Sequence, residues 1–361
     1  MRSRTPAETG LSLITGGAGF IATNVADRLL ERGRRVRLFD NLSRAGVEDN
    51  LQWICSQYRD RVEFVRGDIR DESAVRRALR GVDQVFHFAA QVAVTTSLTD
   101  PFLDFEVNAR GTLNLLEGIR ATERPPSLLF TSTNKVYGDL YDVPLVRRRT
   151  RYEPVDSEVL TNGVSEARAL DFHSPYGCSK GAAEQYVLDY ARTFGLPATV
   201  FRMSCIYGPH QFGTEDQGWV AHFLIQAMRR RPLTLYGDGL QVRDILFVED
   251  LVDAMLLAHE HIEDAAATPF NIGGGPGNTI SLLELLDCIE DITGERPAFG
   301  IEPWRPADQR YYVSNTSRFQ KLTGWRPRVS PRQGVERLLG WLMEAENAAP
   351  RSAVAATKVA S

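Results

Sequence analysis

A tyrosine and a lysine lie four positions apart in the stretch HSPYGCSK, residues 173–180. If this stretch is helical, the hydroxyl of Tyr176 and the ammonium of Lys180 share one face and point toward the same object. A tyrosine that acts as a base near neutral pH needs its pKa lowered from about 10 to about 7, which costs about 4 kcal/mol. A lysine ammonium about 5 Å away contributes about 3 kcal/mol at an effective dielectric constant near 20, so this pair is a candidate catalytic couple.

A second motif, TGGAGFIAT (15–23), lies between an expected strand and an expected helix. Gly16 and Gly19 allow a tight turn and a close approach of the backbone to a pyrophosphate at the positive end of the helix. Asp40 ends the next expected strand about twenty residues later, where a carboxylate binds a ribose 2′-hydroxyl and repels a 2′-phosphate. This context favours NAD over NADP. Asp68 in RGDIRD follows a third expected strand and is placed to reach the adenine end, although aspartate is also common in turns.

The elements that must position these residues appear as alternating periodicities in the first 205 residues. Short apolar runs such as LSLIT (11–15) and DQVFHFAA (83–90) alternate with helical stretches such as FIATNVADRLLERG (20–33) and ESAVRRALRG (72–81). Such a βαβ series predicts an α/β fold with a doubly wound parallel sheet of the Rossmann type, covered by helices on both faces.

After about residue 205 the alternation loosens, and proline, glycine and aromatic residues become more frequent. We expect a smaller α+β substrate-binding lobe here, whose core includes the amphipathic stretches QGWVAHFLIQAMRRR (217–231) and SLLELLDCIEDITG (281–294). The predicted division is a mainly NAD-binding domain at 11–205, to which segments around 240–275 return, a mainly nucleotide-sugar-binding lobe at 206–345, and disordered tails at 1–10 and 346–361.

Composition and charge argue against nucleic acids, membranes and metal ions as partners. The formal net charge is −4, so there is no basic excess for a nucleic-acid backbone. No signal peptide and no apolar run long enough to span a membrane is visible, so no membrane partner is expected. The four cysteines form no CxxC pair, which argues against a zinc site or disulfide framework and fits a cytoplasmic protein. His259 and His261 are two apart on an expected helix and point to different faces, so no metal is expected.

The order of the motifs resembles the short-chain dehydrogenase/reductase superfamily. TGGAGFI, FHFAA (86–90), STNKVYG (132–138), YGCSK and RPADQR (305–310) are similar to its extended branch, the nucleotide-sugar epimerases and dehydratases. The resemblance implies NAD as the cofactor, a nucleotide sugar as the substrate, and Tyr176 and Lys180 as catalytic residues. It also implies a homodimer formed through the Tyr176 helix and the helix near 105–120.

The same resemblance assigns roles to further residues. Thr133 matches the family residue that bridges the substrate hydroxyl and Tyr176, and the oxidised nicotinamide adds positive charge near the phenol. Arg243 and Arg310 match arginines that bind the substrate diphosphate, for which a planar guanidinium is well suited. The other candidates, each of which also fits a local structural role, are Phe20, Ile21, Asn41, Ile69, Ala89 and Ala90 near the cofactor, and Gln91, Thr95, Ser97, His173 and Gln217 near the sugar or base.

The residues after Thr133 separate the reaction types. The resembling 4,6-dehydratases carry Asp-Glu at this point and the decarboxylating relatives use a glutamate, whereas this chain has Asn134 and Lys135. Neither side chain can serve as a carboxylic acid, so elimination is disfavoured. The prediction is therefore epimerisation, by transient oxidation to a ketone and return of the hydride to the opposite face.

Longer stretches favour one subgroup of these epimerases. DNLSRAGVEDNLQW (40–53), LDFHSPYGCSKGAAEQY (170–186) and QFGTEDQGWV (211–220) are similar to members that act at C2 of a CDP-linked hexose. Cys205 stands where the wider family commonly has an asparagine. The members that act at C2 also lack this asparagine. A 4-epimerase of UDP-glucose or UDP-glucuronate is the alternative, followed by a dehydratase and by a non-catalytic NAD-binding regulator.

Overall fold

The computed structural model describes residues 10–348. The predicted disordered tails at 1–10 and 346–361 therefore fall almost entirely outside the described residues. The tail prediction is wrong for 346–348, because helix α14 (Pro331–Ala348) continues through them. The end of this helix, MEAENA, consists mainly of residues with high intrinsic helix propensity, which the sequence analysis did not weigh.

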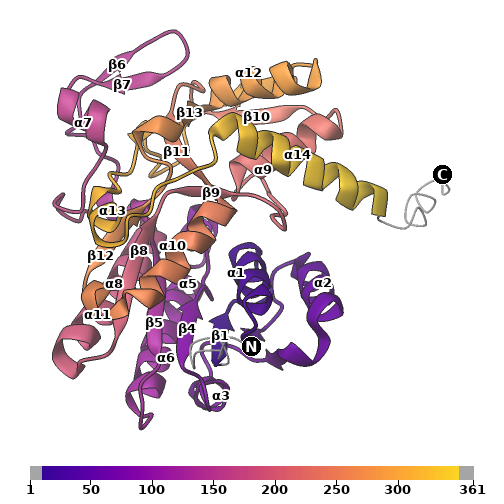
Figure 1. The fold of residues 1–361 in the computed structure, drawn as a ribbon. Coiled ribbons are helices and arrows are strands. Elements are labelled where there is room, and N and C mark those ends of the chain that lie inside the picture. The colour runs from indigo at the N-terminus through magenta and orange to yellow at the C-terminus, as the bar shows by residue number, and fades with distance from the viewer. Residues whose placement is uncertain (1–9, 349–361) are drawn as a thin grey trace.

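A seven-stranded parallel sheet forms the centre of the first part of the chain (Figure 1). Its strand order is β12-β8-β5-β4-β1-β2-β3, and every neighbouring pair runs parallel. The order reverses between β1 and β4, and ligands bind at such switch points beyond the carboxyl ends of the strands. The predicted doubly wound Rossmann sheet is thus confirmed. The strands are β1 (Leu11–Thr15), β2 (Arg35–Asp40), β3 (Val62–Arg66), β4 (Gln84–His87), β5 (Ser127–Thr133), β8 (Ala198–Met203) and β12 (Pro269–Ile272).

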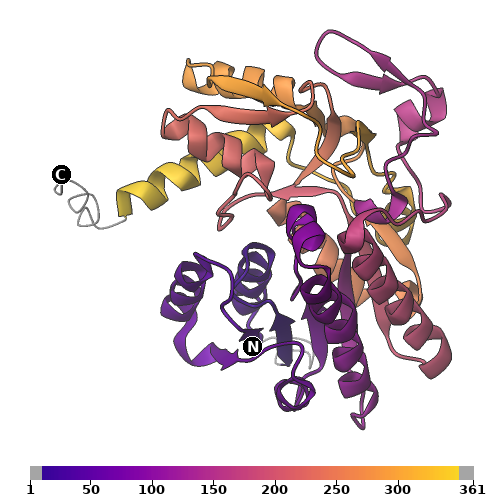
Figure 2. The same ribbon diagram turned by 180° about the vertical axis from the view of Figure 1, so that it is seen from behind.

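Helices cover both faces of this sheet, as Figures 1 and 2 show. Strand residues that alternate in direction enter two separate cores, so that Ile14 packs with α1 and α10 while Leu13 packs with α3, α6 and α8. Burial on both faces explains why the strands read as nearly continuous apolar runs. The covering helices are α1 (Phe20–Glu31), α2 (Val47–Tyr58), α10 (Val248–Glu260), α11 (Ile262–Ala265) and α13 (Ser317–Thr323) on one face, and α3 (Glu72–Ala78), α6 (Gly111–Arg120) and α8 (Ser174–Phe194) on the other.

The segment before α6 is an interrupted helix. It consists of α4 (Val94–Thr99), α5 (Pro101–Phe105) and a π-helical turn at Glu106–Arg110 that leads directly into α6. A π turn is rare and is frequently found at functional sites. Here it packs against α8.

The second lobe contains mixed strands and amphipathic helices. Its core includes Phe223 of α9, Phe247 of β11, Leu286 of α12 and Leu338 of α14, so both helical stretches predicted for this lobe contribute to it. The remaining elements are β6 (Leu145–Arg147), β7 (Tyr152–Pro154), α7 (Ser157–Asn162), β9 (Cys205–Tyr207), α9 (Trp219–Met228), β10 (Leu233–Tyr236), β11 (Val242–Phe247), β13 (Thr279–Ser281), α12 (Leu282–Thr293), β14 (Phe299–Glu302) and β15 (Tyr311–Tyr312), with 3₁₀ turns at Arg59–Arg61, Asn134–Tyr137 and Pro276–Asn278.

Residues 10–348 contain neither a membrane-spanning helix nor a cluster of metal-ligating side chains. No helix in that range is long and apolar enough to cross a membrane. Within the same range, no group of three or more His, Cys, Asp or Glu side chains is arranged to hold a metal ion.

Candidate active site

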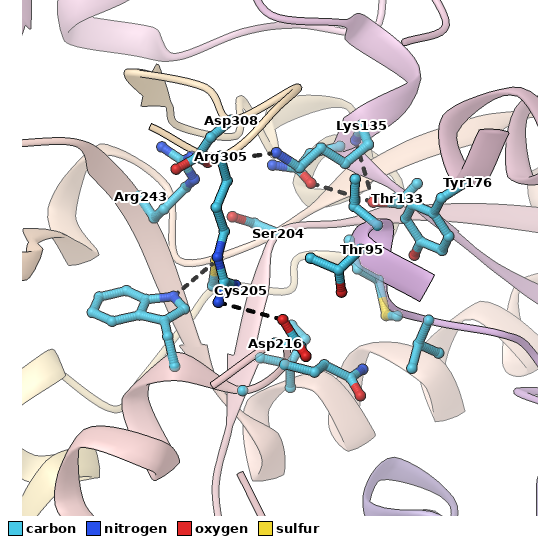
Figure 3. A pocket seen from close by; sticks show the side chains of 18 of the residues that line it. Thr95, Thr133, Lys135, Tyr176, Ser204, Cys205, Asp216, Arg243, Arg305 and Asp308 are labelled. Atoms are coloured by element: carbon cyan, nitrogen blue, oxygen red, sulfur yellow. Dashed lines mark hydrogen bonds and ion pairs between the residues drawn. The ribbon is translucent and has the colours of Figure 1, made fainter. Parts of the chain in front are cut away.

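A cavity of about 420 Å³ lies at the carboxyl ends of the sheet strands. Its walls combine Phe20 and Ile21 from the start of α1 with Thr133 from the end of β5. The second lobe adds Tyr236 from β10 and Arg243 from β11. The cavity therefore joins the first turn of the Rossmann sheet to the second lobe (Figure 3).

Tyr176 lies in the first turn of α8 and faces the cavity beside Thr133 (Figure 3). Burial raises the pKa of Tyr176 to about 12, the Thr133 hydroxyl opposes this rise, and the charge of Asp104 adds to it. We predicted that Lys180 would lower this pKa. This prediction is wrong for the protein by itself, because desolvation of the phenolate dominates its pKa. Thr133 and Asp104 are the side chains that shift it further, and Lys180 is not among them. Activation of the phenol therefore requires further positive charge nearby.

Lys180 follows one turn later on α8 and also lines the cavity. Its Nζ lies 4.2 Å from the centre of the Phe130 ring. Burial lowers the pKa of Lys180 to about 7, while the charges of Asp104 and Glu184 oppose the fall. The lysine is thus held close to its titration point at neutral pH.

Asp104 is a buried carboxylate that the sequence analysis did not single out. Its Oδ1 accepts hydrogen bonds from Nε2 of Gln91 at 2.8 Å and from Nδ2 of Asn108 at 3.1 Å. Its Oδ2 is buried with no hydrogen-bond partner in residues 10–348. Burial raises the pKa of this carboxyl, and the charge of Lys180 is among the influences that oppose the rise. The π turn of the interrupted helix, which carries Asn108, thus helps to hold a negative charge near Lys180.

The first turn fits the cofactor that the sequence predicts. Gly16 has a φ of +66°, and a Cβ there would lie 2.8 Å from the backbone nitrogen of Ala89, so only glycine fits. The carboxylate of Asp40 accepts hydrogen bonds from the backbone nitrogens of Ala18, at 3.0 Å, and Leu42, at 2.8 Å. A carboxylate has about four lone-pair sites, so capacity remains for ribose hydroxyls. The residues present therefore fit an NAD adenosine ribose.

The carboxylate of Asp68 already has two side-chain partners within the protein. Its carboxylate accepts from Nδ2 of Asn41 at 2.9 Å and forms an ion pair with Arg70 at 2.8 Å. The hydrogen bond from Arg70 holds the pKa of Asp68 well below its usual range. Asn41 and Asp68 thus form one hydrogen-bonded unit beyond the ends of β2 and β3.

The structure brings only some predicted residues to the cavity wall. Gln91 and Ser97 are held in local structure instead: the Gln91 amide also donates to the carbonyl of Ala93, and the Ser97 hydroxyl donates to the carbonyl of Val94. The predicted residues on the wall are Phe20, Ile21, Ala90, Thr95, Thr133, Tyr176, Lys180, Gln217 and Arg243. Those off the wall are Gly16, Gly19, Asp40, Asn41, Asp68, Ile69 and Ala89 around the first turns, and Gln91, Ser97, His173 and Arg310 among the sugar and base candidates.

His173 and Arg310 have identifiable partners away from the wall. The His173 ring lies between Asp139, at 3.0 Å, and Asp171, at 3.1 Å, and Asp139 raises its pKa. The Arg310 guanidinium lies 5.4 Å from the ring centre of Trp304. Neither contact could be read from the motifs that suggested the two residues.

Several wall residues were not predicted as contacts. The Arg305 guanidinium lies 3.8 Å from the ring centre of Tyr236 and forms an ion pair with Asp216 at 3.3 Å (Figure 3). The Cys205 thiol accepts from Nε1 of Trp219 at 3.4 Å. Arg305 lies in RPADQR, a motif that could have flagged it, whereas Tyr236 lies in a strand with no motif.

Comparison with known proteins agrees with this geometry. Residues 12–273 match the model of the NAD dependent epimerase/dehydratase family. The chain belongs to this family of Rossmann-type enzymes, which confirms the predicted family resemblance, the fold class and NAD as the cofactor.

Individual relatives cover nearly the whole chain. The CDP-paratose 2-epimerase of Salmonella typhi is 45% identical over 91% of this chain and 98% of its own length. A putative UDP-glucose 4-epimerase of Methanocaldococcus jannaschii is 30% identical over 91% and 97%. The structure of the UDP-glucuronic acid 4-epimerase from Bacillus cereus, in complex with UDP-glucuronic acid and NAD, superposes with a TM-score of 0.80 at 26% identity, over 93% of this chain and 99% of that one.

Proposed function

We propose that this protein is an NAD-dependent epimerase that inverts C2 of a CDP-linked hexose, as in the interconversion of CDP-paratose and CDP-tyvelose. The 45% identity to a CDP-paratose 2-epimerase, along almost the full length of both chains, supports this substrate. A UDP-sugar 4-epimerase is the second candidate, supported by the similarity to the Methanocaldococcus and Bacillus proteins.

One observation carries the reaction type. Thr133, Tyr176 and Lys180 line one cavity, and the two residues next to Thr133 on the same wall are Asn134 and Lys135. The cavity thus offers a proton acceptor for a sugar hydroxyl, while the two positions after Thr133 lack the carboxylic acid that elimination of water would use there.

We assign each of these groups a role in the reaction. Tyr176 removes the proton of the reacting sugar hydroxyl, and the Thr133 hydroxyl hydrogen-bonds to the same oxygen. NAD, when bound, supplies the hydride acceptor and a positive charge near the phenol. Lys180 lies one turn from Tyr176 on α8 and is assigned a second positive charge there when it is protonated. The charge of the nicotinamide has to supply the rest, because burial holds the pKa of Tyr176 at about 12 in the protein by itself. Tyr176 would then return the proton to the ketone oxygen, and the hydride would return to the opposite face of the carbonyl carbon, so no net oxidation occurs.

The substrate contacts are also proposals. Arg243 faces the cavity and is assigned to the diphosphate, while Thr95 and Gln217 are assigned to the sugar or base. Gln91, Ser97, His173 and Arg310 stay predictions, and their positions off the wall do not favour them. We further propose that 11–205 mainly binds NAD, joined by α10 and β12 from the predicted 240–275 segment, and that 206–345 mainly binds the nucleotide sugar. Strand β11, at the start of 240–275, pairs with β9, β13 and β15 and belongs to the second lobe.

The oligomeric state and the cellular location of the protein are also proposals. We propose a homodimer through α8 and the helical segment near 105–120, as the family resemblance implies. Large apolar side chains are exposed on or beside both elements: Tyr186 of α8 is 46% exposed, Phe105 is 54% exposed and the neighbouring Phe102 is 82% exposed. Phe102→Glu should give a monomer in size-exclusion chromatography with light scattering. A cytoplasmic location is supported by four free cysteines, which a reducing compartment preserves.

The test of the function uses purified protein without added NAD. It is incubated separately with CDP-paratose, CDP-glucose, UDP-glucose and UDP-glucuronate, and the sugar protons are followed by NMR. Inversion at C2 of a CDP-sugar is expected. Inversion at C4 of a UDP-sugar would keep the mechanism and replace the proposed substrate with the second candidate.

A further inference from the structure

Lys135 is a cation on the cavity wall to which the reaction assigns no role. It lies in the 3₁₀ turn that follows β5, two residues after Thr133, and its backbone nitrogen donates to Thr133 Oγ1 at 3.2 Å. Its side chain is only 19% exposed. A lysine this deeply placed is uncommon unless its charge is used or paired.

Lys135 shares a carboxylate partner, Asp308, with the proposed diphosphate arginine. Asp308 Oδ1 lies 2.7 Å from Nη2 of Arg243 and 3.7 Å from Nζ of Lys135, and all three side chains face the cavity (Figure 3). The three residues together carry a net charge of +1. Burial lowers the pKa of Lys135, Asp308 opposes the fall and Arg243 adds to it. An added anion would therefore stabilise both cations.

Lys135 also keeps free hydrogen-bonding capacity. Its Nζ donates to the carbonyl of Ala307 at 2.9 Å. The 3.7 Å separation from Asp308 is an ion pair but is too long for a hydrogen bond. Since an ammonium carries three donors, donors remain for an oxygen of a ligand in the cavity.

The covalent structure of the substrate restricts which anion can lie there. In a nucleotide sugar the proximal phosphate is attached through oxygen to C1. When C2 is the carbon that reacts beside Thr133 and Tyr176, this phosphate is attached at the adjacent carbon. When C4 reacts, the phosphate lies across the ring. Lys135 lies on the same cavity wall as Thr133, two residues along the chain. Its charge is therefore better placed for the phosphate of a substrate that reacts at C2 than for one that reacts at C4.

We propose that Lys135 binds the sugar-proximal phosphate together with Arg243, and that it is a specificity-determining residue that presents C2 rather than C4 to Thr133 and Tyr176. This inference rests on the proposed function. A phosphate bound at this point leaves the sugar ring free to rotate about the bond from C1 to the phosphate oxygen. Such a rotation is needed because the hydride leaves one face of the sugar carbon and returns to the other.

The test compares two ligands that differ by that phosphate. Binding of CDP and CMP to the holoenzyme is measured by calorimetry for the wild type, for Lys135→Gln and for a control, Lys321→Gln, whose site on α13 is outside the cavity. Glutamine keeps a donor for the Ala307 carbonyl and removes the charge. If the glutamine variant does not fold, Lys135→Met or Lys135→Arg carries the comparison, and arginine should retain the preference for CDP.

We expect Lys135→Gln to bind CDP about tenfold more weakly and CMP within about twofold of the wild type, a difference of about 1.4 kcal/mol. The control should change neither. Equal weakening of both ligands would mean that Lys135 only holds the 305–308 loop and would overturn the inference, as would unchanged CDP binding. If the wild type inverts C4 of UDP-sugars, the proposed function fails separately, and UDP with UMP then tests the phosphate contact alone.

Discussion

The ammonium of Lys180 lies 4.2 Å from the centre of the Phe130 ring, so this lysine, to which we assign a catalytic role, is held against an aromatic face in a buried position. The ring interacts favourably with a cation but does not replace its hydration. Burial consequently lowers the pKa of Lys180 to about 7 despite the opposing charges of Asp104 and Glu184.

This lowered pKa predicts how stability depends on pH. In the unfolded chain the lysine titrates near 10.4. Between about pH 7 and that value the unfolded state binds more protons than the folded state, so stability rises with pH across this window. The variant Lys180→Met has no ionisable group at this position and so lacks this contribution to the pH dependence of stability. Urea unfolding at pH 6.5 and pH 9.5 should give a larger gain in the free energy of unfolding for the wild type than for the variant; equal gains would contradict the lowered pKa.

Tyr176→Phe removes one hydroxyl and keeps the ring. Turnover should fall about 10²- to 10⁴-fold, the usual contribution of general acid–base catalysis. The NAD content and the midpoint of thermal unfolding should remain close to those of the wild type. A variant that retains full turnover would exclude Tyr176 as the base, and one that loses NAD would leave turnover uninformative, so cofactor content is measured on the same sample.

Asp104→Asn tests the buried carboxylate near the lysine. The amide keeps the shape but removes the negative charge that raises the pKa of Lys180, so that pKa should fall further. The alkaline limb of the pH–rate profile should move to lower pH by about one unit, equivalent to about 1.4 kcal/mol. A purely structural role would lower the rate at every pH without moving the limb.

Asp40→Asn tests the preference for NAD. The asparagine oxygen can still accept from the backbone nitrogen of Ala18, but repulsion of a 2′-phosphate is removed. In apoprotein reconstituted with either cofactor, discrimination against NADP should fall by about tenfold, or about 1.4 kcal/mol. Asp40→Glu, which keeps the charge, is the matched control and should still exclude NADP. Unchanged discrimination in the asparagine variant would assign the selectivity to other residues.

Local sequence patterns predicted the framework of the site. The glycine turn at Gly16, the strand end at Asp40 and the i,i+4 pair of Tyr176 and Lys180 each depend on a few neighbouring residues, and the structure has these residues on the expected elements. Parallel strands then carry them to one edge of the sheet, a consequence of topology that alternating periodicity predicts.

The parts that sequence did not reveal depend on contacts distant along the chain. Asp308 meets Lys135 across 173 positions, and Tyr236 meets Arg305 across 69, with no local signal for either pair. Asp104 could not be identified from the sequence, because its burial depends on how α5 packs against α8. The same reason explains why the pKa of Tyr176 is raised in the protein although its neighbour is a lysine.

The central claim, hydride transfer at C2 with return to the other face, is tested most directly with CDP-paratose that carries deuterium at C2. The protein is incubated with this substrate in ordinary water, and the product is examined by NMR and mass spectrometry. We predict inversion at C2 with the deuterium still on that carbon, because the same hydride leaves and returns. Inversion with loss of the label to solvent, or no inversion at C2, would contradict the account.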